Sequence, residues 1–397
     1  MNKAIFFLVF LIFSLKVSGQ NVNAFMQEVL KYHPYIVSGR EMLLTKKAES
    51  KTGLTPADPN INIGYFPGIP ESIGDKVTWS VSQSIDFPTV YKNIKIKKEY
   101  DYEQAVLEFR LAVIILLEEA REKAIMMIAL QKHINRTEKR IEHLEKLEEA
   151  YSKMLDEGEA TIIEYNKISL DLAAMKNSLM EYESDQQMVK SYLDLISSNN
   201  SEMIEDSDYP LFDKPVFPDL LEEKREMHPS FIIPEKDIII AESNLKLEKS
   251  KQLPALNIGF ASEIIAANQF TGPTVGLSIP LWKNKGRVKK ARAEKSSYEV
   301  QSESNIKMLE NSVRNRYNKY LSIKEGLTVL EQSLKEYTSS DLLLNALEEG
   351  EISIIEYFTE LSAYYDIEDK IIEKEKEYYI LCSQLYDHFP DLNFQEN

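Results

Sequence analysis

Carboxylates crowd two short segments of this 397-residue chain, and each segment surrounds a glycine. The first segment places Asp156, Glu157, Glu159 and Glu164 around Gly158. The second has the same arrangement, with Glu348, Glu349, Glu351 and Glu356 around Gly350. Side chains of this type can perform acid–base chemistry or attract cations. Acidic residues are also favoured near helix N-termini by the helix dipole, so a purely structural role remains open.

The rest of the chain offers no chemistry that would complete an active site. It contains no nucleophile elbow, HExxH, CxxC or phosphate-binding loop. His133 and His143 are ten residues apart and point to different helix faces. His33 and His228 each precede a proline, and neither has a second His, Cys or carboxylate cluster beside it. We therefore predict no enzyme activity, no cofactor and no metal site.

The second half of the chain repeats the first with a nearly constant offset. His33-Pro34 returns as His228-Pro229, 195 residues later (228 − 33). The segment from Gly158 to Tyr165 returns at Gly350 to Tyr357, 192 residues later (350 − 158), with Gly-Glu and Ile-Ile-Glu-Tyr retained. A repeated unit of this kind completes itself by packing against its copy. The alternative is chance similarity between two charged helical stretches.

Each half contains two segments that alternate polar and apolar residues, which predicts two strands in each. The expected strands cover about 60–66, 76–86, 255–264 and 273–281, with loops at Pro67–Asp75 and Ile265–Gly272. One face of these strands is small and polar. It carries Asn62, Ser80, Ser82, Ser84, Asn257, Glu263, Thr274 and Ser278. The pattern fits a sheet between lipid and a water-filled lumen, and it fits equally a soluble hairpin on a core.

The remainder of each half is predicted to be helical. His33 and His228 read as N-caps with proline at the first helical position, beginning helices that run to about Ser50 and Lys249. From about 90 to 155 there is neither proline nor glycine, which allows a helix of about 100 Å. Apolar residues in the predicted hairpin at about 90–198 recur at spacings of three and four, typical of a coiled-coil seam. A second long hairpin is expected at about 287–388, with its helix unbroken from about Arg287 to Leu347.

Residues 1–19 read as a cleaved secretory signal, with Lys3 followed by an apolar run and small residues. The chain has 64 acidic and 47 basic residues, a net charge of −17, which argues against nucleic-acid binding. The predicted organisation is a signal at 1–19, a first repeat at 20–200 and a linker at 201–227. A second repeat at 228–390 and a tail at 391–397 follow. Four strands cannot close a barrel alone, so a membrane location requires several copies.

With these features the chain resembles the TolC family of outer-membrane efflux channels, over nearly the whole mature length. The resemblance rests on the duplication, the X-Pro helix starts, the two strand hairpins and the Gly-Xaa5-acidic turns. It implies a fold that is mainly α with a transmembrane β-barrel portion. Three copies would form one twelve-stranded barrel in outer-membrane lipid and a helical periplasmic tunnel. The eight polar residues above would line the barrel lumen.

The resemblance also implies that the two glycine turns are periplasmic tips. They would form the gate and contact a periplasmic adaptor, the membrane fusion protein, of a system with an inner-membrane RND-type pump. The candidate tip residues are Gly158, Glu159, Glu164, Tyr165, Gly350, Glu351, Glu356 and Tyr357. A trimer would bring 24 tip carboxylates together (8 × 3), which favours cations. Some family members have an arginine in the turn where this chain has Ala160 and Ile352, so that gate contact does not transfer.

Segments 83–88 and 272–282 are similar to the cation-efflux branch of the family, the CusC and CzcC type. Many members of that branch carry a lipidated cysteine at the mature N-terminus, and this chain has none there. The predicted function is a passive exit duct that carries heavy-metal cations to the exterior. Export of drugs or proteins by the same fold, and a secreted coiled-coil scaffold, remain alternatives.

Overall fold

A computed structural model describes residues 20–204, 207–212, 216–266, 268–282, 286–336 and 340–386. The predicted signal peptide and C-terminal tail lie outside these residues. The described chain divides into two compact units, and each draws on both halves of the sequence. Unit 1 consists of the described residues within 1–37, 113–220 and 312–391, and unit 2 of those within 38–112 and 221–311. The predicted repeat boundaries remain predictions.

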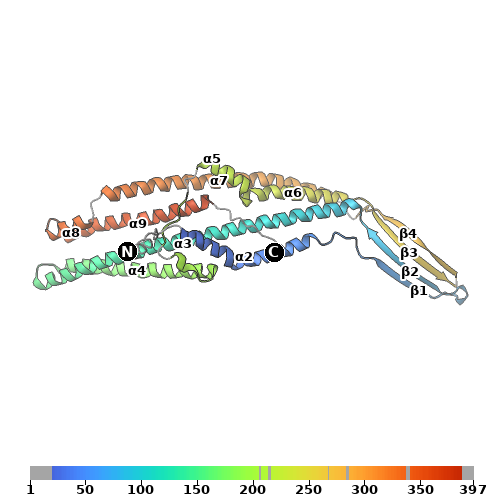
Figure 1. Cartoon of the computed structure of the whole chain (residues 1–397), viewed down its shortest axis with the longest axis horizontal. Helices are drawn as coiled ribbons and strands as arrows, with labels where there is room; N and C mark the ends of the chain where they lie inside the picture. Colours follow the sequence, from blue (N-terminus) through green and yellow to red (C-terminus); the bar gives the residue numbers. More distant parts are fainter. Residues whose placement is uncertain are drawn as a thin grey trace, which may run out of the picture. The chain divides into compact units, whose positions relative to one another are not determined.

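The first half of the chain runs from two helices through a strand hairpin to a helical hairpin (Figure 1). Helices α1 (Gln20–Tyr32) and α2 (Pro34–Ser50) precede strand β1 (Asn60–Phe66), the 3-10 helix η1 (Glu71–Ile73) and strand β2 (Lys76–Ile85). Helix α3 (Pro88–Glu157) has 70 residues and is followed by α4 (Ile162–Ser197). The strands and the first helical hairpin agree with the predicted positions.

The second half follows the same order of element types. The short helices η2 (Ser201–Ile204) and α5 (Phe217–Met227) precede α6 (Pro229–Ser250), β3 (Ala255–Ile265) and β4 (Asn268–Ser278). Helices α7 (Arg287–Glu336), α8 (Ser340–Glu348) and α9 (Ile354–Leu385) complete it. One unbroken helix is predicted from 287 to 347, and α7 and α8 are helical within this range; residues 337–339 between them lie outside the described residues, so the continuity of the helix stays a prediction.

The strands form one antiparallel sheet in the order β1-β2-β3-β4, so β1 and β4 are its edges. The predicted limits of β4 are wrong at both ends. Residues 268–272 were expected in a loop, but they pair with Ala261–Ile265 of β3, so their polar side chains do not mark a turn. The strand ends at Ser278, and Pro280 lacks the N–H that would continue the ladder.

The predicted helix caps are confirmed. His228 is the N-cap of α6, and its Nδ1 accepts a hydrogen bond from the Ser230 N–H at 3.1 Å. The Tyr35 N–H donates in the same way to Nδ1 of His33, at 3.2 Å, where α2 begins. In both helices proline takes the first position, where its missing N–H is not needed.

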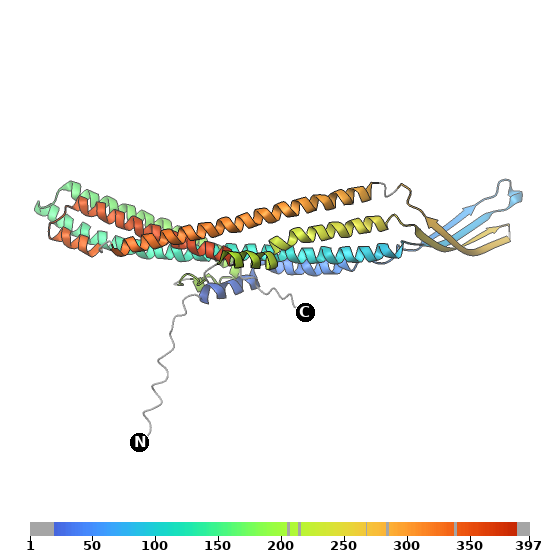
Figure 2. The same cartoon turned by 90° about the horizontal axis from the view of Figure 1, so that it is seen from above.

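The core of unit 1 lies between the two helical hairpins. Ile141, Leu144 and Leu147 of α3 are buried with Ile168 and Leu172 of α4, which confirms the predicted seam. Helix α9 completes the cluster with Ile354, Tyr357, Phe358 and Leu361. Figures 1 and 2 accordingly show the α3–α4 turn and the α8–α9 turn at the same end of unit 1. We call the segments 154–165 and 346–357 the two tips.

In unit 2, helix α2 lies close to the first part of α3. A Cβ atom on Gly39 would stand 2.2 Å from the ring of Phe109, so only glycine permits this approach. The Lys98 ammonium donates to the carbonyl oxygens of Glu49 and Thr52, at 3.0 and 2.6 Å, and so satisfies acceptors at the end of α2. Among the described residues, no helix has the length and hydropathy needed to cross a membrane.

Candidate functional site

Each tip begins at the C-terminal end of a helix, and the two helix ends have the same pattern of backbone hydrogen bonds. The Glu159 N–H donates to the Met154 carbonyl at 2.7 Å, and the Gly158 N–H donates to the Leu155 carbonyl at 3.2 Å. This pair of bonds is the Schellman motif, which ends a helix through a residue in the left-handed conformation. Gly158 has φ 79°. Its conformation, and not a lack of space, calls for glycine, because an added Cβ would meet nothing within 4 Å.

The tip of the second hairpin has the same geometry. The Glu351 N–H donates to the Ala346 carbonyl at 2.8 Å, and the Gly350 N–H donates to the Leu347 carbonyl at 3.1 Å. Gly350 has φ 74° and open space around it. The two predicted glycine turns therefore have one backbone design.

Two of the predicted tip carboxylates are helix caps. The Thr161 N–H and hydroxyl donate to Glu164 at 2.7 and 2.8 Å, and the Glu164 N–H donates back to the Thr161 hydroxyl at 3.3 Å. Ser353 and Glu356 make the same reciprocal bonds at the start of α9. These are capping boxes. The sequence carries the corresponding signals, Thr-Xaa-Xaa-Glu and Ser-Xaa-Xaa-Glu, although capping boxes are not among the features predicted above.

The capping bonds also fix the charge of these two carboxylates. The pKa of Glu164 is lowered from its ordinary value of 4.5, first by the backbone N–H of Thr161 and then by its hydroxyl. The N–H and hydroxyl of Ser353 lower the pKa of Glu356 in the same order. Both groups are therefore anionic at neutral pH and held at the helix N-terminus, where the dipole favours a negative charge.

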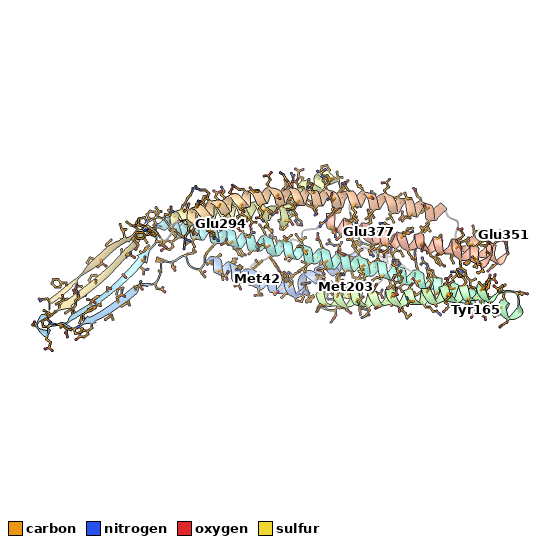
Figure 3. All side chains as sticks on the ribbon, turned by 180° about the vertical axis from the view of Figure 1, so that it is seen from behind. Met42, Tyr165, Met203, Glu294, Glu351 and Glu377 are labelled. Carbon is orange, nitrogen blue, oxygen red and sulfur yellow. The ribbon has the colours of Figure 1, made fainter. Side chains whose placement is uncertain are left out.

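The two tyrosines paired by the repeat differ in their surroundings. Tyr357 is fully buried, and its hydroxyl lies 2.5 Å from Nε2 of His143 on α3. Burial raises the pKa of Tyr357, so it remains a neutral phenol. Tyr165 is only half-buried. Tyr357 thus packs between the hairpins, and of this pair only Tyr165 offers side-chain surface at a tip (Figure 3).

Besides the two capping glutamates, six carboxylates at the tips are exposed to solvent. They are Asp156, Glu157, Glu159, Glu348, Glu349 and Glu351. Glu159 and Glu351 directly follow the two glycines, and Figure 3 places Glu351 at the turn before α9. Unlike Glu164 and Glu356, these side chains do not belong to the capping boxes. In the part of the chain that the structure describes, no three His, Cys, Asp or Glu side chains are arranged to hold a metal ion.

An ionic network above the tips joins α3 to α9, and none of its contacts is predicted from the sequence. The buried Arg140 guanidinium donates to Asp369 at 2.9 Å and to Glu368 at 3.0 Å. It also lies over the ring of Tyr365, 4.1 Å from the centroid. The partners are about 230 residues apart in the chain, so no local sequence pattern joins them.

The network continues along the same two helices at His133. Its ring is buried, stacks on Tyr182 of α4 at 4.7 Å, and places Nε2 3.2 Å from Glu373. The hydrogen bond to His133, followed by the contact with Lys376, lowers the pKa of Glu373 to about 2. The first helical hairpin and α9 are therefore held together by charge as well as by apolar packing.

The predicted lumen residues all lie on one face of the sheet. The strand register places Asn62 beside Ser80, Ser82 on the same side as Thr274, and Asn257 beside Ser84. Glu263 and Ser278 have the same parity, and Glu263 forms an ion pair with Lys76 on this face. We call it the polar face, although Phe66 and Phe270 also belong to it. The opposite face, which we call the apolar face, carries Ile61, Ile63, Trp79, Val81, Ile258, Phe260, Val275 and Leu277.

Comparison with known proteins gives a result at the level of structure only. No protein-family model matches the sequence, and no curated protein matches it. The outer-membrane channel OprN superimposes with a TM-score of 0.79 at 13% identity, over 93% of this chain and 90% of that one. The outer membrane protein VceC from Vibrio cholerae gives 0.75 at 10% identity, over 92% and 96%. This chain has the fold of these outer-membrane proteins.

The structural similarity extends over almost the whole length of both chains in each comparison. CusC, described as forming a transmembrane channel, gives a TM-score of 0.74 at 10% identity, over 92% of each chain. The similarity to CusC is no greater than that to OprN or VceC. The comparisons therefore support the fold without favouring the cation-efflux branch.

Proposed function

We propose that this protein is the outer-membrane exit duct of a tripartite efflux system and belongs to the TolC-like family. The observation that carries the proposal is the similarity to outer-membrane channels over more than 90% of the chain. In this role the protein conducts passively, and an inner-membrane pump supplies the energy. It needs no cofactor and catalyses no reaction.

The sheet supports a barrel built from three copies. One chain contributes four strands with two free edges, β1 and β4. Unpaired edges are not tolerated in lipid, and four strands are too few to close a barrel. Three copies supply twelve strands, with β4 of one copy beside β1 of the next. The polar face then lines a water-filled lumen and the apolar face meets lipid.

The helical hairpins then form the periplasmic tunnel, with the two tips at its entrance. The partners in this arrangement are a periplasmic adaptor and an RND-type pump, and the exposed carboxylates beside Gly158 and Gly350 lie at the entrance. For the substrate we propose heavy-metal cations, which the acidic tips and the similarity of segments 83–88 and 272–282 to the cation-efflux branch favour. Export of drugs or proteins uses the same fold and is the second candidate.

The proposed role as an exit duct can be tested with protein that has been exported to the outer membrane and then purified. We expect the protein to require detergent, to cross-link as a trimer and to form low-conductance pores in planar bilayers. Asn257→Leu, on the polar face, should lower the conductance, whereas Ile258→Leu, its neighbour on the apolar face, should not. A protein that remains soluble and monomeric without detergent would contradict the proposal and favour a secreted scaffold.

The substrate is tested separately in a strain that lacks the gene. We expect growth of this strain to be more sensitive to zinc, copper or cobalt than growth of the parent, with the sensitivity reversed by the restored gene. Sensitivity to drugs alone would favour the second candidate. This outcome would not contradict the proposed role as an exit duct, because the pore measurement does not depend on the substrate.

A further inference from the structure

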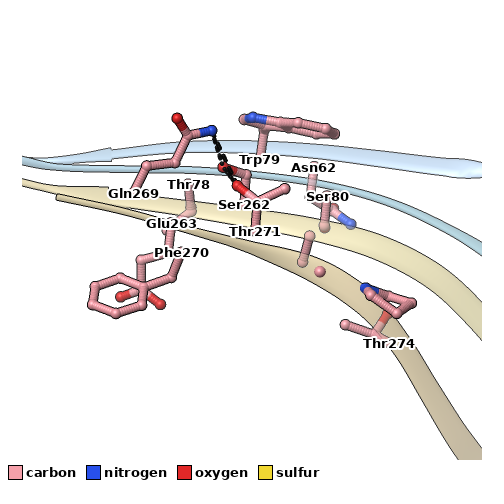
Figure 4. Close-up of a pocket in the computed structure, with 13 residues that line it drawn as sticks. Asn62, Thr78, Trp79, Ser80, Ser262, Glu263, Gln269, Phe270, Thr271 and Thr274 are labelled. Atoms are coloured by element: carbon pink, nitrogen blue, oxygen red, sulfur yellow. Dashed lines mark hydrogen bonds between the residues drawn. The ribbon is translucent and has the colours of Figure 1, made fainter.

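Three neighbouring polar side chains on β3 and β4 interrupt the apolar face of the sheet, and Gln83 on β2 is a separate polar residue of that face. The Ser262 hydroxyl lies 2.8 Å from the Thr271 hydroxyl, and the Gln269 amide donates to Thr271 at 3.0 Å and to Ser262 at 3.4 Å. Ser262 is only 2% exposed. In Figure 4 Gln269 and Trp79 lie on one side of the sheet, and Glu263 and Phe270 lie on the other. The three residues, which we call the polar trio, are hydrogen-bonded to one another.

The strand register shows that the trio is level with apolar residues on the other two strands. Ile63 of β1 pairs with Trp79 of β2, which pairs with Ser262, which pairs with Thr271 of β4. In the next row toward the hairpin loops, Tyr65 and Val77 are level with Gln269. At one level along the strands, the face is therefore apolar on β1 and β2 but polar on β4.

At the helix end of the sheet, the apolar residues extend further on β3 and β4 than they do on β1. The apolar residues of β1 begin at Ile61, which is level with Phe260 and Pro273. Strands β3 and β4 continue for two more apolar rows, Ile258 with Val275 and Leu256 with Leu277. Ile85 on β2 and Ile264 on β3 are exceptions, one near each end of the middle strands. The apolar band therefore slants toward the helix end as it passes from β1 to β4.

The size of the slant matches the tilt of strands in a membrane barrel. On the loop side the band ends at Tyr65 on β1, level with Val77, and at Pro273 on β4, level with Val81. This is a shift of four residues (81 − 77), or about 14 Å at about 3.4 Å per residue. The three strand spacings between β1 and β4 add up to about 14 Å at about 4.8 Å each. Equal steps along and across the strands correspond to a tilt of about 45°, close to the tilt of membrane strands.

Resting on the proposed barrel, we propose that the hydrocarbon boundary crosses the apolar face obliquely, from Tyr65 on β1 to Pro273 on β4. The polar trio then lies at the level of the lipid headgroups, beyond the boundary on β3 and β4. Ile63, in the same row, lies inside the hydrocarbon. Trp79 stands between them beside the trio, where a tryptophan ring is favoured at the membrane interface. The partner that fits this surface is a lipid bilayer. Its headgroups contact the side of the boundary that carries the polar trio, and its acyl chains contact the side that carries Ile63.

The test compares two positions in one row of the sheet. Spin labels are attached to Ile63→Cys, Thr271→Cys and Val275→Cys in a Cys382→Ala background, and the proteins are reconstituted in phosphatidylcholine vesicles. We expect the labels at 63 and 275 to collide mainly with oxygen, and the label at 271 to collide mainly with a water-soluble nickel chelate. Equal depth at 63 and 271 would overturn the slanted boundary. If none of the three labels contacts lipid, the proposed barrel itself fails.

A second measurement avoids labels altogether. The chain has two tryptophans, so Trp282→Phe leaves Trp79 as the only one. We expect lipids with bromine near the headgroup to quench Trp79 fluorescence at least twofold more than lipids with bromine at the bilayer centre. Stronger quenching from the centre would place Trp79 deep in the hydrocarbon and contradict the proposed boundary.

Discussion

At the scale of single residues, a hydroxyl at each tip holds the start of the following helix. Replacing Thr161 or Ser353 by alanine removes the acceptor for the N–H of Glu164 or Glu356. We expect each change to lower the free energy of unfolding by about 1 kcal/mol, the usual effect of losing an N-cap. Thermal unfolding followed by circular dichroism measures the difference. Ser184→Ala, on the exposed face of α4, serves as the control and should leave stability nearly unchanged.

The stability that the capping box contributes is expected to depend on pH, because its glutamate must be ionised. Because the pKa of Glu356 is lowered in the folded chain, its stabilising contribution is present above its ordinary value of 4.5 and is lost as pH falls below it. We expect Glu356→Gln to lower the melting temperature at pH 7 and to have a smaller effect at pH 3. A constant difference at both pH values would show that the charge of Glu356 does not contribute to the cap.

The glycines of the tips are required by their backbone conformation. We expect Gly350→Ala to destabilise the protein by about 1 kcal/mol, because a Cβ atom is unfavourable at positive φ. Gly350→Asn should be less harmful, since asparagine tolerates this conformation better. The control is Gly326→Ala within α7, where the space around the glycine is also open. This change should stabilise by about 0.5–1 kcal/mol, and destabilisation by both alanines would contradict the argument.

At the scale of elements, α3 and α9 depend on the ionic network around Arg140. Its side chain is 6% exposed and pairs with two carboxylates. Removing one partner of a buried pair leaves the other charge uncompensated. We therefore expect Arg140→Ala to lower the free energy of unfolding by about 3 kcal/mol. Lys146→Ala, which breaks an exposed pair with Glu142 on the same helix, should have almost no effect.

The same network is expected to weaken in acid. The pKa of Glu373 is lowered to about 2 by the hydrogen bond to His133 and then by Lys376. Its contribution is present above its ordinary value of 4.5 and is lost as the pH falls from there to about 2. In Glu373→Gln the melting temperature should decline less between pH 4.5 and 2 than in the unchanged protein. Parallel declines would contradict a role for this carboxylate.

The elements differ in how far the sequence predicts them. Alternation located all four strands, and the glycines located both hairpin turns, because these signals are local. The sequence-based prediction places the start of β4 too late, because Gln269 and Thr271 are polar on a face that is otherwise mostly apolar. The burial of Tyr357 and the pairing of Arg140 with Asp369 depend on contacts between α3 and α9, more than 200 residues apart. No periodicity within either helix specifies that contact.

At the scale of the whole molecule, the tip carboxylates are expected to set ion selectivity in the proposed trimer. Glu159 and Glu351 are exposed and follow the turn glycines, so three copies place six of them at the entrance (2 × 3). Rings of carboxylates attract cations and oppose anions. We expect Glu159→Gln with Glu351→Gln to lower the cation-to-anion permeability ratio several-fold, measured from reversal potentials in planar bilayers under a salt gradient.

Salt and a charge-matched control distinguish this local effect from the overall negative charge. The screening length is about 10 Å at 0.1 M salt and about 3 Å at 1 M, so the difference between the variants should be large at low salt and small at high salt. Glu138→Gln with Glu183→Gln removes the same charge from exposed positions on the shafts of α3 and α4. It should leave the ratio close to that of the unchanged protein. Equal losses in both double variants would assign selectivity to the net charge of −17 and not to the tips.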